Sequence, residues 1–427
     1  MVADGAAPVG WTTRHPRANA QATTFSEPLE QRPDPLSAFT VDAAAELGGP
    51  DWLQARRRAA AERFGAAELP SEQEEVWRYS RIGELDLERF APAPTAAQVV
   101  VDLPASWREA GATVRRGDEV PEGALGEGPD AFALLNDAFA ADPVVIDVPR
   151  GAQLTEPASI ATTVSGEGAA AFPRLVVRVG DGAAARIVER TGSDAGAVLS
   201  VPLTEVSVGP NARLDLVTVQ QLGPAAWQLG SLVATVAQQG DLRVSTVALG
   251  GDYARLRTEC ALKGRGANGD LLAAYFGDGT QMLDFRTFQH HRAADTTSNL
   301  LFKGAVGGRS RSVYTGLIRV DREARGTNAF QTNRNIKLSD DAWAESVPNL
   351  EIETNDVRCS HASTVGPVDP EQRFYLESRG VPPKVADRLI VAGFFDEVVR
   401  QLPGDDLVAE VRDAIAAKLD RVAEDLS

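Results

Sequence analysis

The sequence contains few of the residues that bind metals or form disulfides. Among its 427 residues are two cysteines and four histidines. Two cysteines cannot form a disulfide framework, so we expect a reducing, cytoplasmic environment. Residues 1–10 lack the basic segment and apolar stretch of a secretory signal. There is no run of about 18 apolar residues, so we expect no transmembrane helix.

Excess positive charge and phosphate-binding loops are also absent. The formal net charge is −17, and such an acidic surface argues against nucleic acid or an anionic membrane as a partner. No Gly-x-x-x-x-Gly-Lys-Ser/Thr loop occurs, so any ATP chemistry is expected to come from a partner. The chain is 43% hydrophobic and 24% charged, a composition typical of a soluble protein with two or three structural units.

The first third of the chain divides into a tail and a helical region. Residues 1–45 are rich in Ala, Pro, Thr, Gln and Asp and show little periodicity, so we expect a mobile tail. Residues 46–140 are expected to form a mostly helical region, with a helix from Asp51 and a capping-box-like Ser71 and Glu74. We expect Trp77 and Tyr79 to pack in a local core.

From about residue 141 the sequence becomes rich in strands that repeat. Residues 177–188 align without gaps with residues 206–217, at an offset of 29 residues, and a weaker copy surrounds Gly240 and Asp241. A fixed offset of this size indicates stacked repeats. A β-solenoid, a propeller and a sandwich are all possible, but the Trp-Asp signatures of propeller blades are absent. The repeat favours a right-handed parallel β-helix over residues 141–366, with small residues such as Ala183, Ala185 and Ala212 facing inward; a sandwich is the alternative.

Residues 367–427 have a helical pattern and are expected to form a C-terminal helical domain. Asp369 and Pro370 start a first helix, in which Phe374, Tyr375 and Leu376 are expected to lie inside. Two further helices carry apolar stripes: Val385, Leu389, Ile390, Phe394, Val398 and Leu402 in one, and Leu407, Val411, Ile415, Leu419 and Val422 in the other. Phe394 and Phe395 add more apolar surface than a short helical hairpin needs for its own packing, so this surface is predicted to dock a partner.

The strongest candidate site lies in residues 349–366, where Cys359 and His361 are separated by one residue. In an extended strand such residues point to the same face. A thiolate beside an imidazole suits a soft or borderline metal, or a thiol activated by histidine. A purely structural role for both residues is the alternative, because free cysteines are often small buried hydrophobes.

The other histidines and the second cysteine carry weaker signals. His290 and His291 are adjacent, so on a strand they point to opposite faces and cannot chelate one metal together. We expect both to be exposed or interface polar residues. Cys260 lies in a predicted strand without a recognisable motif, and we interpret it as a buried structural thiol.

Several motifs together resemble the SufB/SufD family of iron–sulfur cluster assembly proteins. They are residues 75–79, 296–304, 314–318, 331–335, 348–352 and 374–380, and Cys359-Ser360-His361. Within that family the chain is most similar to the SufD branch, because the SufB branch has a Glu-His-Glu type sequence at the position of Cys359-Ser360-His361. The resemblance covers roughly residues 70–400.

The resemblance implies a non-catalytic scaffold subunit with a β-helix between helical ends. It implies a SufB-like partner bound through the β-helix and a SufC-like ATPase bound through the C-terminal helices. His361 would face the partner's cysteine, with Cys359 as a second ligand, and a transient iron–sulfur cluster or iron would be shared with that partner. Mixed thiolate and imidazole ligands raise the potential of a cluster relative to thiolates alone.

Two other functions remain open on the residues themselves. One is a purely structural β-solenoid adaptor in which Cys359 and His361 are inert. The other is a cysteine-dependent β-helix hydrolase, although the sequence near Cys359 shows neither a third group to orient the base nor an oxyanion site.

Overall fold

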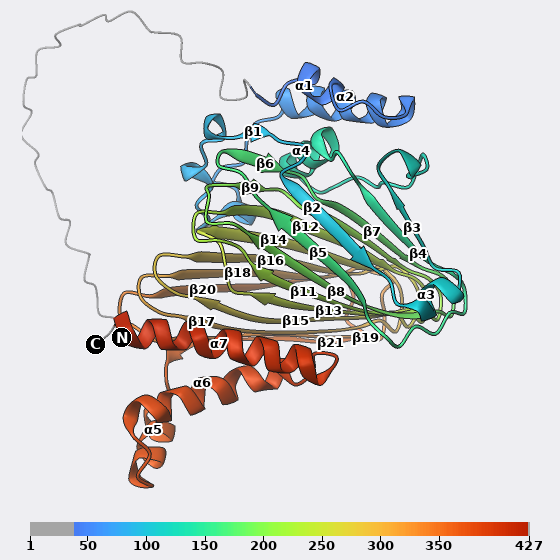
Figure 1. Cartoon of the computed structure of the whole chain (residues 1–427). Coiled ribbons are helices and arrows are strands. Elements are labelled where there is room, and N and C mark those ends of the chain that lie inside the picture. Colours follow the sequence, from blue (N-terminus) through green and yellow to red (C-terminus); the bar gives the residue numbers. More distant parts are fainter. Residues whose placement is uncertain (1–37, 426–427) are drawn as a thin grey trace, which may run out of the picture. The chain divides into compact units, whose positions relative to one another are not determined.

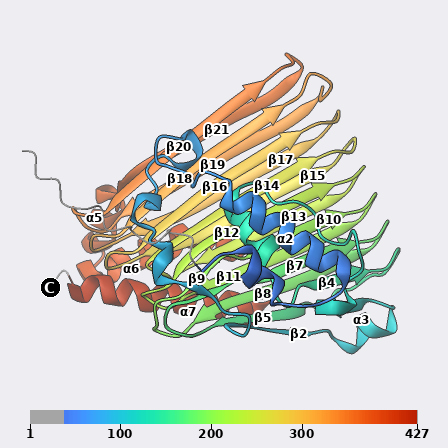
Figure 2. The same cartoon turned by 90° about the horizontal axis from the view of Figure 1, so that it is seen from above.

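The central feature of the computed structural model, which describes residues 38–425, is a parallel β-helix built from two sheets (Figures 1 and 2). Successive strands alternate between the sheets. Sheet A has the order β20-β18-β16-β14-β12-β10-β7-β4-β3, and sheet B the order β2-β5-β8-β11-β13-β15-β17-β19-β21. The structure is therefore mainly β, with a parallel β-helix core and helices on both sides of it in sequence, as predicted.

Within the described residues, each sheet has nine strands in its main order. Sheet A contains β3 (Thr113–Arg116), β4 (Val144–Val148), β7 (Arg174–Val179), β10 (Leu203–Val208), β12 (Trp227–Val236), β14 (Tyr253–Leu262), β16 (Met282–His291), β18 (Arg311–Val320) and β20 (Trp343–Ile352). The short strands β1 (Ala91–Pro92), β6 (Ala169–Ala171) and β9 (Leu199–Ser200) also join it. Sheet B contains β2 (Ala97–Asp102), β5 (Ala158–Val164), β8 (Ala184–Ser193), β11 (Arg213–Gln221), β13 (Asp241–Ala248), β15 (Asn268–Gly277), β17 (Thr297–Val306), β19 (Thr327–Lys337) and β21 (Val357–Pro367).

Helices precede and follow the β-helix in the chain. Before it come α1 (Val41–Ala45), α2 (Asp51–Gly65), α3 (Ala105–Glu109), α4 (Ala131–Phe139) and the 3-10 turns η1 (Glu75–Trp77), η2 (Ile82–Glu84), η3 (Leu87–Arg89) and η4 (Gly117–Glu119). After it come α5 (Pro370–Ser378), α6 (Pro383–Val399) and α7 (Asp405–Asp425). None of the helices within residues 38–425 is both long and apolar enough to cross a membrane.

The strand register reproduces the repeat seen in the sequence. Val177 of β7 pairs with Val206 of β10, and Ala184 of β8 pairs with Arg213 of β11, so both sheets advance by the sequence offset. These pairs are parallel, which rules out the sandwich of antiparallel sheets. Ala183 is buried in the interior, together with Ala185 and Ala212. Small inward side chains let successive turns stack closely.

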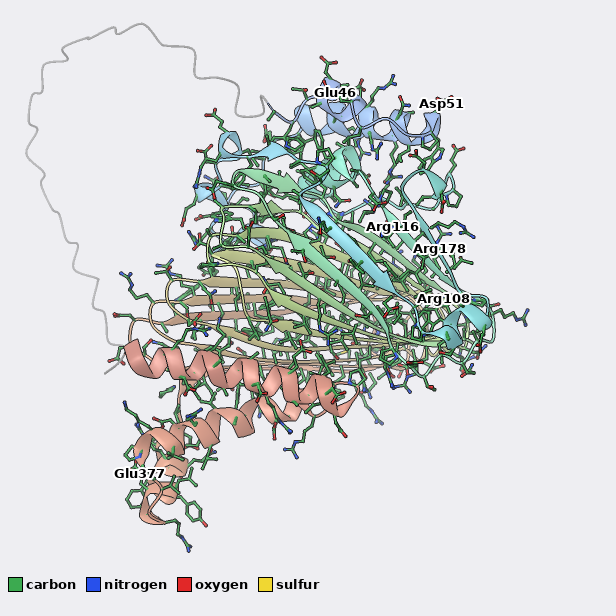
Figure 3. The ribbon with its side chains drawn as sticks, viewed as in Figure 1. Glu46, Asp51, Arg108, Arg116, Arg178 and Glu377 are labelled. Carbon is green, nitrogen blue, oxygen red and sulfur yellow. The ribbon has the colours of Figure 1, made fainter. Side chains whose placement is uncertain are left out.

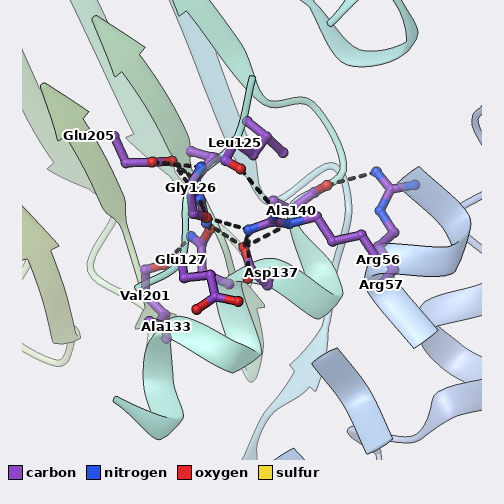
Figure 4. Close-up of polar contacts among 12 residues, drawn as sticks. Arg56, Arg57, Leu125, Gly126, Glu127, Ala133, Asp137, Ala140, Val201 and Glu205 are labelled. Atoms are coloured by element: carbon purple, nitrogen blue, oxygen red, sulfur yellow. Dashed lines mark hydrogen bonds and ion pairs between the residues drawn. The ribbon is translucent and has the colours of Figure 1, made fainter. Parts of the chain in front are cut away.

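The N-terminal region covers the outer face of sheet A, and a buried ion network holds it there (Figure 4). Arg174 of β7 donates to Asp137 of α4 at 2.6 Å and pairs with Glu205 of β10 at 2.5 Å. Arg56 of α2 reaches the same Asp137 at 2.8 Å. Because each buried charge has a partner of opposite sign, the region packs on the sheet without an unpaired charge in this network.

Two predictions for the N-terminal part need correction. The tail was expected to extend to residue 45, but Val41–Ala45 form α1; the rest of the predicted tail, residues 1–37, lies outside the described residues. The region 46–140 also contributes strands β1, β2 and β3 in addition to helices. Trp77 is buried as expected, whereas Tyr79, which has a φ of 64°, is 42% exposed.

The helices α6 and α7 cover the outer face of sheet B. Their apolar side chains form one cluster with outward residues of β8, β11, β13, β15 and β17. Phe395 of α6 is fully buried and stacks on Phe276 of β15, with ring centroids 6.1 Å apart. The buried Lys418 of α7 donates to the Leu249 carbonyl oxygen at 2.5 Å. The apolar side chains of α6 and α7 are thus largely buried against sheet B.

The apolar stripe predicted for α7 is buried as expected, whereas α5 and part of α6 differ from the prediction in the faces that they bury. Phe374 and Tyr375 of α5 were expected inside but are 73% and 58% exposed. Leu389, at the predicted stripe of α6, is 52% exposed, while Val391 and Phe395 are buried instead. Val398 and Leu402 of the predicted stripe are buried as expected, so the face of α6 that packs on sheet B differs only in part from the predicted one.

Candidate functional site

The two ends of the β-helix are built differently. At the first turn, β2 pairs with β5 and β3 pairs with β4 in antiparallel fashion, so short added strands cover both sheets. At the last turn, β20 and β21 are the final strands, and neither sheet has a further strand within the described residues (Figure 2). Exposed strand edges present unpaired backbone groups that readily accept another chain.

Cys359 and His361 lie on β21 at this open end and point inward. They pair with Ala329 and Gln331 of β19, which are both buried in the interior. Cys359 is half-buried against an apolar cluster that includes Ile318 of β18, whereas His361 is exposed. No hydrogen bond joins the two side chains. They therefore present a thiol and an imidazole side by side on the uncovered inner surface.

The protonation state of the Cys359 thiol determines whether it can act as a nucleophile or as a metal ligand. Burial raises the pKa of the Cys359 thiol above its usual value, and a backbone hydrogen bond from Ala329 offsets only part of that shift. A free thiol at this position is a weak nucleophile, because the reactive form is the thiolate. A bound metal would remove the proton.

The open end of the β-helix holds too few ligands to coordinate a metal by itself. No cluster of three or more His, Cys, Asp or Glu side chains occurs in residues 38–425. Structural metal sites with such ligands use about four of them. Cys359 and His361 could supply two, so further ligands would have to come from outside the chain.

A polar layer lies beneath this surface, and reasoning from the residues did not find it. Asn333 of β19 donates to the Tyr275 hydroxyl at 2.9 Å, and that hydroxyl lies 2.7 Å from Asn335. Gln331 is only 1% exposed, yet neither polar atom of its side chain has a partner within residues 38–425. The signal that could have found them is the 331–335 motif, whose alternate residues Gln331, Asn333 and Asn335 share the inward face.

Two glycines of the recognised motifs make room for this layer. A Cβ atom at Gly304 would overlap the Tyr275 ring and the Asn335 side chain. A Cβ atom at Gly316 would overlap the Tyr314 hydroxyl and the Gln331 amide. These positions need glycine because neighbouring side chains occupy the space.

The remaining candidates have structural positions. His291 is fully buried and bonds to Thr296 and Ser298 at 2.8 and 2.9 Å, so the prediction that it is exposed or at an interface is wrong. Burial lowers the pKa of His291 to about 4, which keeps it neutral. His290 is half-buried beside Asp321. Cys260 is buried, as predicted, and burial raises its pKa to about 12.

These observations define a class of protein: a parallel β-helix whose open end carries an inward-facing thiol and imidazole. The chain belongs to the SufBD family, because the family model described as "SUF system FeS cluster assembly, SufBD core domain" matches residues 162–394. That match includes the repeat, the polar layer and both residues of the candidate site. The chain is therefore an iron–sulfur cluster assembly protein of this family.

Similar proteins carry the same family name. The iron–sulfur cluster assembly SufBD family protein of Mycobacterium tuberculosis is 35% identical over 379 residues, which cover 84% of this chain and 90% of that protein. The relative in Mycobacterium leprae is 32% identical over 367 residues, covering 83% and 91%. The relative in Synechocystis is 25% identical over 409 residues, covering 85% and 90%.

Proposed function

We propose that this chain is the SufD-like scaffold subunit of an iron–sulfur cluster assembly complex, without turnover of its own. It acts with a SufB-like subunit and a SufC-like ATPase in the cytoplasm. The observation that carries the proposal is the position of Cys359 and His361 on the inner surface of an uncovered end.

The ligand set supports a shared and transient cluster. Iron bound by thiolate and imidazole is an established arrangement, and the chain offers one residue of each kind at this end. The missing ligands would come from the partner, including a cysteine. A cluster whose ligands belong to two subunits can be released when the subunits move apart, which suits cargo that must be passed on.

The edges of β20 and β21 support pairing with a second β-helix. Both strands run through ten or more residues, and all of these residues are only partly buried or exposed. A partner with the same architecture could continue both sheets across the open end, which would satisfy the backbone groups and enclose the site.

The alternatives explain fewer of the observations. In a purely structural adaptor, nothing requires Cys359 and His361 to share an inward face at the uncovered end. A hydrolase would need Cys359 as a thiolate, but burial raises the pKa of this thiol and His361 makes no hydrogen bond to it.

Anaerobic co-purification tests the proposed function. We expect the chain, co-expressed with a SufB-like subunit and a SufC-like ATPase, to elute as one complex that contains iron and acid-labile sulfide. The same chain purified alone is expected to contain little of either. Elution of the chain separately from both subunits would contradict the proposal, and hydrolytic activity of the isolated chain would favour the enzyme.

The ATPase is proposed to dock on α5 and the adjoining half of α6. Phe374, Tyr375, Val385 and Leu389 are exposed large apolar side chains in these two helices. Tyr375 and Leu389 also line a groove between α5 and α6. Figure 3 shows that α5, where Glu377 is labelled, lies beyond α6 from the strands, so this surface is left free by the β-helix. Exposed apolar patches of this kind mark interaction sites.

Phe374→Asp is expected to reduce ATPase co-purification about tenfold or more, because the interface would have to bury a charge without a partner. Because Phe374 is exposed, the free energy of unfolding should change by less than roughly 0.5 kcal/mol. The measurement is the ATPase retained per chain on an affinity column, with thermal unfolding alongside.

Val100→Asp on β2 is the matched control. It introduces the same charge at another exposed apolar residue, away from α5. The control should retain the ATPase. Equal retention by Phe374→Asp and the control would show that the ATPase binds elsewhere.

A further inference from the structure

A small cavity lined by both apolar and polar side chains lies inside the β-helix, away from the open end. Its lining includes the carboxyl group of Glu189, the hydroxyl residues Thr191, Thr204, Thr218 and Thr246, and the amide of Gln228. These residues come from β8, β10, β11, β12 and β13, whereas Cys359 lies on β21. The volume in which the centre of a water molecule can lie is about 60 Å³. By the same measure one water needs roughly 10–15 Å³, so the cavity can hold a small hydrated ligand or an ion.

Among residues 38–425, Glu189 is the only charged side chain that lines this cavity. It pairs through the backbone with Ile160 on one side and Thr218 on the other, and Thr246 follows on the next strand. Ile187, two residues earlier on the same face, is buried in the interior core. The carboxyl group of Glu189 therefore points inward, and within residues 38–425 it makes neither an ion pair nor a hydrogen bond to another side chain.

An ionised carboxylate without a counter-charge is costly in such a place. Burial raises the pKa of Glu189 to about 7, so the group titrates near neutral pH. The surrounding strands of the described chain contribute no other acidic or basic side chain to the cavity lining. Above neutral pH the cavity therefore holds one negative charge, several neutral oxygens and no positive group.

We propose that this cavity binds a single monovalent metal cation, with the Glu189 carboxylate and the surrounding hydroxyl and amide oxygens as ligands. One carboxylate among neutral oxygens balances one positive charge. Calcium sites generally use several carboxylates, and magnesium needs near-ideal octahedral geometry. Soft metals prefer thiolate or imidazole, and neither lines the cavity. The inference concerns turns of the β-helix remote from the assembly site and does not depend on the proposed function.

The proton and the cation compete for Glu189. Without a cation, the folded protein binds the Glu189 proton more tightly than the unfolded chain, whose glutamates have a pKa of about 4.3. The stabilisation from this proton is complete below that value and is lost as the pH rises to about 7. A bound cation would restore the lost stability in the alkaline range, where the carboxylate is free.

The test is thermal unfolding of the full chain at about pH 8 in equal concentrations of potassium, sodium or tetramethylammonium chloride. The methyl groups of the last cation prevent its direct coordination by oxygen ligands. Binding to the folded state should raise the Tm in potassium or sodium by about 2–4 °C over tetramethylammonium. The difference should vanish at about pH 5, where Glu189 is protonated, and in Glu189→Gln at either pH. Glu122→Gln, which neutralises an exposed carboxylate, should respond as the wild type does.

A second variant and a direct measurement keep the inference open to refutation if Glu189→Gln folds poorly. Thr218→Val preserves the side-chain shape but removes one neutral ligand, and it should reduce the Tm difference without abolishing the pH dependence. Equilibrium dialysis with thallium(I), a potassium substitute, should show one equivalent bound per wild-type chain at about pH 8 and less in Thr218→Val. Identical wild-type Tm values in all three salts, or no thallium retained, would overturn the proposal.

Discussion

Asp284→Ala is expected to lower the free energy of unfolding by roughly 3–5 kcal/mol, the cost of breaking a buried ion pair by removing one partner. Asp284 of β16 is fully buried. Its carboxylate accepts hydrogen bonds from Arg286 at 2.6 Å, Tyr253 at 2.8 Å and Arg255 at 3.0 Å. Both guanidinium groups are also buried, so alanine would leave two positive charges without a counter-charge.

The same carboxylate holds the N-terminal region in place indirectly. Arg255, oriented by Asp284, donates to the Val76 carbonyl oxygen at 2.8 Å and lies 3.6 Å from the centre of the Trp77 ring. Arg286 donates to the Arg78 carbonyl oxygen at 2.7 Å. We therefore expect the substitution to release η1 from sheet A, in addition to its cost within the sheet.

Urea denaturation at neutral pH measures the effect of Asp284→Ala. Arg265→Ala is the control, since it removes one member of an exposed ion pair with Asp295, and such pairs contribute about 0–1 kcal/mol. A loss for Asp284→Ala no larger than that of the control would show that the buried network is not stabilising.

The pH dependence of the Asp284 network has the opposite sign to that of Glu189. Burial alone would raise the pKa of Asp284, but the two guanidinium groups hold it below its usual value. The stabilisation is present above the unfolded pKa of about 3.9 and is lost as the pH falls through the lower folded value. Acid unfolding of the wild type should reflect this loss, and Asp284→Ala should lack that component.

His361→Ala is expected to leave the complex assembled but to lower its iron and acid-labile sulfide about tenfold or more. Alanine has no lone pair, and loss of even an outer-shell partner of a metal ligand costs 10–100-fold in metal affinity or activity. Cys359→Ala should have a milder effect, because the partner's cysteine can supply a thiolate. The measurement is iron and sulfide per anaerobically isolated complex.

The His361→Ala comparison should not be affected by loss of folding, because the His361 side chain is exposed and makes no hydrogen bond within residues 38–425. Circular dichroism checks the fold of each variant. Ser363→Ala is the matched control, since Ser363 lies two residues further along β21 on the same face. Wild-type iron and sulfide in the His361→Ala complex would remove His361 from the site and favour the structural adaptor.

The sequence alone determined the repeat and therefore most of the β-helix. Successive turns of a parallel β-helix pair strand on strand, so their inward residues recur at a constant spacing. That spacing is visible in the sequence as an internal repeat and in the structure as the register between turns. Period two also places Cys359 and His361 on one face of a strand, whatever the surroundings. The sequence also predicted that the strands end near residue 366, but which face is inward, and that no further strand covers β21 within residues 38–425, became known only from the packed β-helix.

Tertiary structure decided what each apolar or charged face contacts. The spacing on α6 and α7 indicated that they bury apolar side chains, but not that sheet B covers Phe395 while α5 keeps Phe374 exposed. Likewise, nothing local distinguishes the inward Glu189 from a surface glutamate, or pairs Asp284 with Arg255. The periodicity of apolar residues predicts that one face of an element is buried. It does not predict which element covers that face, because the covering residues are distant in sequence and come close only when the chain folds.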